Sequence, residues 1–150
     1  MTTMRARVSI SIAAIAMATL GVGCGSSSPG ESANPPVFPA DPLSSVVADD
    51  GATHLEVRTA PAQPPTRGVV DVEIVVRDPN GAPVDGLSLD VVPWMSAHGH
   101  GASASPSVVD EGAGRYWVRD VDLFMPGDWD LRVQISGTVH TQLDAHLQVQ

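Results

Sequence analysis

Apolar and polar residues alternate along most of the chain between residues 53 and 150. The clearest run has Val70, Val72, Ile74 and Val76 at alternate positions, with mostly polar residues between them. A two-residue period places one set of side chains on one face of a β-strand, so this run predicts a half-buried strand. Similar runs lie at residues 87–91, 116–119, 129–135 and 143–149, with weaker ones at 45–48 and 54–59.

Turn-forming residues separate these runs. Asp78-Pro79-Asn80-Gly81 is the clearest example, because proline presets φ and the Asn-Gly pair tolerates a positive φ. Short strands at this spacing, without helical periodicity, are typical of an antiparallel sandwich. The pattern predicts one all-β domain over residues 43–150, an antiparallel β-sandwich of about seven strands.

The N-terminus has the layout of a targeting segment. Arg5 and Arg7 precede an uncharged apolar run over residues 8–23, which is shorter than the roughly 20 residues of a membrane-spanning helix. The run ends at Cys24 and resembles a bacterial lipoprotein signal, in which the cysteine is lipidated. We therefore expect a signal peptide at residues 1–23 and a periplasmic or cell-surface lipoprotein anchored through Cys24. Ordinary cleavage nearby is the alternative.

Composition and charge narrow the classes of partner. Residues 24–42 are rich in Ser, Pro, Gly and Ala and are expected to form a flexible linker. Without Arg5 and Arg7, six arginines stand against 17 acidic residues, a net charge of −11. This charge disfavours nucleic acid and anionic headgroups as partners and is compatible with cations. Cys24 is the only cysteine, which excludes an intrachain disulfide and a multi-cysteine zinc site.

Signatures of catalysis are weak. The glycines between Gly99 and Gly114 do not form a phosphate-binding loop, and no serine lies in a nucleophile-elbow motif. Asp120 and Asp122 alternate on one strand face and are expected to be solvated. We therefore expect no enzymatic activity.

Two short segments gather soft and borderline metal ligands. Met95, His98 and His100 lie close together in the sequence, and Met125 precedes a turn predicted at Pro126-Gly127. The remaining three of the five methionines lie in the leader. Imidazole and thioether suit copper better than magnesium, calcium or manganese, and an uncharged ligand set favours Cu(I). Alternatively, the two methionines simply fill gaps in the core.

The other histidines and the tryptophans are expected to have structural roles. His54, His140 and His146 have no partners at ligand spacing and are interpreted as surface residues. The large indole rings of Trp94, Trp117 and Trp129 are best explained by packing, because a sandwich without a disulfide depends on its core. Trp94 or Trp129 can also shield the edge of a metal site.

These residues resemble a known family. The segments Pro93-Trp94-Met95 to His100, residues 112–116, and Phe124-Met125-Pro126-Gly127-Asp128-Trp129 are similar to YtkA-like domains of exported bacterial proteins. The resemblance spans about residues 68–149. It implies an immunoglobulin-like sandwich, and some relatives are linked with copper handling or delivery to respiratory oxidase copper centres. The candidate copper ligands that it implies are Met95, His98, His100 and Met125.

Together these features predict an envelope-anchored protein that binds copper, with a role in Cu(I) storage, transfer or chaperoning. Its expected partners are the copper ion and an envelope cuproprotein or oxidase assembly factor, with membrane contact through the lipid anchor only. The alternative is a metal-free protein-interaction module of the cell envelope. That alternative predicts that Met95 and Met125 are buried and that His98 and His100 point apart.

Overall fold

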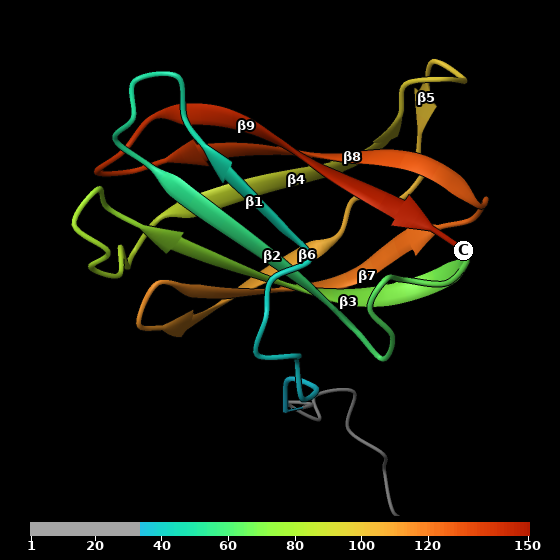
Figure 1. Ribbon diagram of the computed structural model, residues 1–150, viewed down its shortest axis with the longest axis horizontal. Coiled ribbons are helices and arrows are strands. Elements are labelled where there is room, and N and C mark those ends of the chain that lie inside the picture. Colours follow the sequence, from blue (N-terminus) through green and yellow to red (C-terminus); the bar gives the residue numbers. More distant parts are fainter. Residues whose placement is uncertain (1–33) are drawn as a thin grey trace, which may run out of the picture. The chain divides into compact units, whose positions relative to one another are not determined.

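Strands make up all the regular secondary structure in residues 34–150, the part of the chain that the computed structural model describes (Figure 1). The predicted signal peptide, the lipidation site Cys24 and the first part of the predicted linker lie outside the described residues. Within the described part, no helix has the length and hydropathy needed to cross a membrane.

Within residues 34–150, nine antiparallel strands form two sheets, which confirms the predicted all-β sandwich. One sheet has the order β1-β2-β3-β7-β6 and the other has the order β5-β4-β8-β9. The strands are β1 (Ser44–Val47), β2 (His54–Ala60), β3 (Gly68–Arg77), β4 (Ser88–Met95), β5 (His100–Gly101), β6 (Ser107–Gly112), β7 (Arg115–Leu123), β8 (Gly127–Ser136) and β9 (Thr141–Val149).

The two strands beyond the predicted count are β5 and β6, each at an edge of its sheet. β5 has only two residues, which is too short to show any period. β6 is mostly exposed, and of its residues Val108 packs against the core. A strand that buries so little surface needs few apolar residues, so its sequence carries no clean alternation.

Apolar residues from both sheets fill the space between the layers. β8 contributes Trp129, Leu131, Val133 and Ile135, and β9 contributes alternate apolar residues from Leu143 to Val149. β2, β3 and β7 supply the opposing side chains, including Leu55, Ile74 and Tyr116. The two-residue period seen in the sequence is therefore the period with which side chains enter the core.

Tyr116 forms hydrogen bonds with the loop between β3 and β4. Its hydroxyl donates to the carbonyl of Val84 at 2.9 Å and accepts from the amide of Leu87 at 3.1 Å. Burial raises the pKa of this hydroxyl, so it keeps its proton and its donor role at neutral pH.

The chain passes from one sheet to the other at residues 124–126, between the end of β7 and the start of β8. β4 ends at the same end of the molecule, because Trp94 pairs with Asp130 near the start of β8. Figure 1 shows β5 and its turn projecting beyond this end of the four-stranded sheet. The topology therefore brings together the two segments in which the sequence concentrates histidine and methionine.

Candidate metal site

A tight turn follows β4 and carries both candidate histidines. The amides of His98 and Gly99 donate to the carbonyl of Met95 at 3.1 and 3.0 Å, and Gly99 has a φ of +69°. Glycine adopts this backbone conformation without steric cost. Met95 and His100 are cross-strand partners, so their side chains leave the same face of the sheet.

The two imidazoles lie near each other. The ring centroids of His98 and His100 are 5.7 Å apart and their planes are inclined by 42°. Both residues are exposed. The structure therefore brings the rings of two candidate ligands close together on one exposed turn.

An aromatic row links the exposed turn to the core. The His100 ring stacks on Phe124, with centroids 5.7 Å apart and planes inclined by 16°. Phe124 in turn meets the edge of Trp129 at 5.2 Å and 85°. Trp129 is wholly buried and its indole N–H donates to the carbonyl of Met125 at 2.9 Å. These contacts place the turn after β4 next to residues 124–126, the segment that connects β7 to β8.

Both methionines pack against the core at this end. Met95 is only 3% exposed, whereas Met125 is partly buried. A Cβ atom on Gly127 would lie 3.0 Å from the methyl carbon of Met95, so the missing side chain at Gly127 leaves room for the thioether. The burial of Met95 agrees with the core-filling alternative, and the nearby imidazoles agree with the metal-site hypothesis.

A polar cluster that the sequence did not indicate borders the turn. The hydroxyl of Ser96 donates to Asp130 at 2.7 Å, and the Nδ1 atom of His146 lies 3.3 Å from the same carboxylate. The Nε2 atom of His146 lies 3.5 Å from Asp128. His146 is exposed, as expected for a surface residue, but it has two carboxylate neighbours. The alternation of Asp128 and Asp130 on β8 is the one signal in the sequence that places both on one face.

The bond from Ser96, aided by His146, lowers the pKa of the Asp130 carboxyl below its usual value. A lowered folded-state pKa stabilises the fold above the pKa of the unfolded chain, and this contribution disappears as pH falls through the folded value. At neutral pH the carboxylate therefore stays ionised and fixes the start of the turn.

Among the described residues, no group of three or more His, Cys, Asp or Glu side chains is arranged to hold a metal ion. The two imidazoles of the turn therefore need ligands of another kind to complete a metal site. The thioethers of Met95 and Met125 are the nearest candidates by topology, because one precedes the turn and the other follows Phe124.

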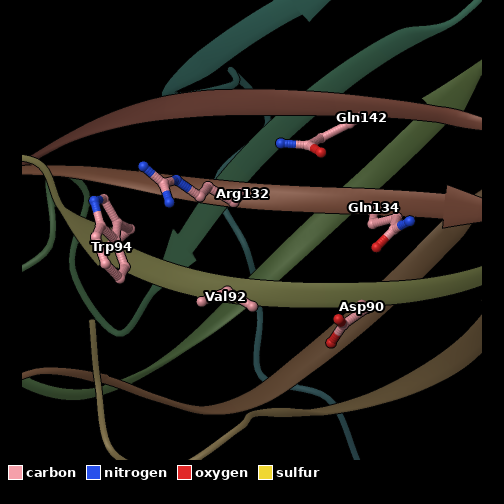
Figure 2. A pocket seen from close by; sticks show the side chains of 6 residues that line it. All are labelled: Asp90, Val92, Trp94, Arg132, Gln134 and Gln142. Carbon is pink, nitrogen blue, oxygen red and sulfur yellow. The ribbon is translucent and has the colours of Figure 1, made fainter. Parts of the chain in front are cut away.

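Trp94 lies beside the turn on the outer face of the four-stranded sheet. Its ring is 4.3 Å from the guanidinium carbon of Arg132, a cation–π contact. The two residues flank a shallow depression of about 230 Å³. Figure 2 shows them together at one end, with Asp90 and Gln134 toward the other. Trp94 is half-buried, whereas Trp117 and Trp129 are buried as predicted.

Comparison with known proteins gives a family for this chain. Residues 49–134 match the family model described as YtkA-like, which covers more than half of the chain. The chain belongs to the YtkA-like family. The match includes all four candidate ligands and confirms the resemblance seen in the sequence. β1 and β9 of this YtkA-like protein lie outside the matched residues. No curated protein and no solved structure matches the chain.

Proposed function

We propose that this YtkA-like protein binds one Cu(I) ion at the turn after β4 and holds it for storage or transfer. The imidazoles of His98 and His100 and the thioethers of Met95 and Met125 would form the ligand set. The observation that carries the proposal is the 5.7 Å separation of the two imidazoles on a turn that starts at a buried thioether. Copper is the cargo here, and no catalytic step is proposed.

The chemistry of these side chains favours Cu(I) over harder cations. Thioether and imidazole are soft and borderline ligands, and neither brings a negative charge. A monovalent ion bound by neutral groups leaves less charge to stabilise at the edge of an apolar core than a divalent ion does. The methionine side chain also adapts readily, because it is unbranched and has three rotatable bonds. A thioether packed in the core beside Gly127 can therefore approach an ion at the surface by changing its rotamer.

Phe124 and Trp129 would give this site a hydrophobic wall. Phe124 stacks on His100 and fixes one face of its ring, while the opposite side of the turn is open to solvent. Phe124 is itself 36% exposed, and a partner protein can approach from the open side of the turn. This arrangement suits an ion that is passed to a recipient, such as an envelope cuproprotein or an oxidase assembly factor.

We further propose that the protein is exported and anchored to a membrane through a lipid on Cys24. This part of the proposal is supported by the sequence of residues 1–24, with its basic start and uncharged apolar run. Mass spectrometry of the mature N-terminal peptide tests it. A peptide that begins at an unmodified residue other than Cys24 would contradict it.

Competition with a chromophoric Cu(I) chelator tests the copper proposal. We expect one equivalent of Cu(I) to bind, and we expect the double variant His98→Ala/Met125→Leu to lose on the order of 100-fold in affinity because two ligands are removed. Leucine keeps most of the apolar volume at residue 125, which limits the effect on packing.

The matched control is His140→Ala, which removes an exposed histidine from the loop between β8 and β9 at the far end of those strands. We expect this variant to bind Cu(I) like the unaltered protein. Equal affinity in the double variant and the control would contradict the proposal.

The second candidate function is a metal-free protein-interaction module. The burial of Met95 favours it, because a fully packed thioether needs no metal to explain its place. This function predicts that Cu(I) does not bind in the titration above, although the protein is folded.

A further inference from the structure

Positive charge gathers on the outer face of the five-stranded sheet, away from the candidate metal site. Arg58 on β2, Arg77 on β3 and Arg115 on β7 line a depression of about 270 Å³. These are three of the six arginines that follow the predicted signal peptide, in a chain with 17 acidic residues. The depression therefore gathers positive charge, whereas the chain as a whole is negatively charged.

The register of the strands explains the grouping. Arg58 is the cross-strand partner of Glu73, and Arg115 is the cross-strand partner of Val75. Arg77 follows Val75 by two residues and so lies on the same face of β3. The segment Phe38–Ala40 bounds the depression on another side, and the carbonyl of Ala40 accepts two hydrogen bonds from Arg58.

The carboxylates nearby do not satisfy all three guanidinium groups. Glu73 is 6% exposed; its carboxylate accepts from Arg115 at 2.8 Å and lies 3.6 Å from the Nη1 atom of Arg58. Arg58 also pairs with Glu56 at 2.8 Å. Arg77 has no acidic partner among the described residues and donates only to the carbonyl of Gly81, at 3.2 Å. Three positive charges thus face two negative charges.

Among the residues that the structure describes, one nitrogen of the Arg58 guanidinium group lacks a hydrogen bond. Its Nη1 atom is buried and has no hydrogen-bond partner within the described part of the chain. It lies 3.6 Å from the Glu73 carboxylate, an ion-pair contact that is too long for a hydrogen bond. A buried donor that lacks a hydrogen bond is costly, and such groups usually find a partner in a ligand, an ion or water. Arg58 lines the depression together with Arg77, so an acceptor bound there would have both guanidinium groups nearby.

We propose that this depression binds a small oxyanion, a carboxylate or a phosphate group. A guanidinium group has planar N–H donors that match both groups, and the resulting charge-assisted bonds are stronger than neutral ones. Phe38 and Val75 add apolar surface to the lining, which favours an anion with a small apolar part. The residues after the predicted signal peptide carry a net charge of −11, which repels extended polyanions and anionic surfaces. The ligand is therefore a small molecule.

Titration of the full-length protein with inorganic phosphate and with acetate tests this proposal, followed by NMR of the arginine Nε–H groups. We expect saturable shifts at Arg58 and Arg115 with at least one of the two anions. Arg77→Gln should weaken that binding by about tenfold, the effect of one lost charge-assisted hydrogen bond. Arg77 makes no ion pair with the residues that the structure describes, so this variant is expected to fold.

The control variant is Arg132→Gln, which removes the same charge from the outer face of the other sheet. It should bind both anions as the unaltered protein does. Shifts that do not saturate, or that weaken equally in the two variants, would overturn the proposal. Phosphatidylglycerol vesicles separate a lipid headgroup from a free anion: we expect vesicle association to be the same in both variants. Loss of vesicle association in Arg77→Gln alone would overturn the small-molecule assignment.

Discussion

Replacement of Trp129 by alanine is expected to lower the free energy of unfolding by about 3–5 kcal/mol, the usual cost of removing a large buried aromatic side chain. Trp129 is wholly buried between the sheets. It also supports the crossover, because its N–H donates to Met125 and its ring meets Phe124. Urea unfolding followed by circular dichroism measures the change.

Two further variants separate packing from hydrogen bonding at this position. Trp129→Phe keeps a ring but leaves the Met125 carbonyl without its donor, and we expect a loss of about 1–3 kcal/mol. Trp94→Ala removes a half-buried indole whose ring contacts Arg132, and we expect about 1 kcal/mol. An unfolding midpoint for Trp129→Ala equal to that of Trp94→Ala would contradict the role assigned to Trp129.

Replacement of Gly114 by alanine is expected to cost at least about 3 kcal/mol, because it combines a positive φ with a steric clash. Gly114 has a φ of +70°, and an added Cβ would lie 2.5 Å from the Val76 carbonyl oxygen and 3.0 Å from Pro83. The backbone cannot move aside easily, since the Gly114 carbonyl accepts from the amide of Val76 at 2.8 Å. The thermal unfolding midpoint of the variant measures this cost.

Gly112 provides the matched control in the same turn between β6 and β7. Its φ is +76°, but an added Cβ would have no atom within 4 Å. Gly112→Ala should therefore cost only about 1–2 kcal/mol, the strain of a positive φ. Ala113 between them already has a φ of 54°, so the turn accepts a Cβ where space allows. Equal destabilisation by the two variants would show that the contact with Val76 is not responsible.

The sequence predicted the strands whose alternation is driven by burial. β3, β8 and β9 bury one face completely or nearly so, and their apolar residues therefore repeat every second position. The pattern did not predict β6, because most of its residues are exposed and need not be apolar. The pairing of strands into two sheets depends on contacts between residues far apart in the chain, which no local pattern records.

Part of the candidate site followed from spacing alone. His98 and His100 lie two residues apart with glycine between them, and the structure brings their rings close together. The contact of Phe124 with His100 was not predictable, because it requires that the crossover and the turn lie at the same end of the molecule. The burial of Met95 depends on the space at Gly127, which belongs to another strand. The contact between Asp130 and His146 was not predictable either, because it depends on the pairing of β8 with β9.

X-ray absorption at the copper edge of the Cu(I)-loaded protein reports which atoms are bound to the metal. We expect both nitrogen scatterers at about 2.0 Å and sulfur scatterers at about 2.3 Å, by analogy with imidazole and sulfur ligands of other metals. The sulfur signal should weaken in Met125→Leu and persist in His140→Ala. A spectrum with nitrogen or oxygen scatterers alone, unchanged by Met125→Leu, would contradict a site built from both imidazole and thioether.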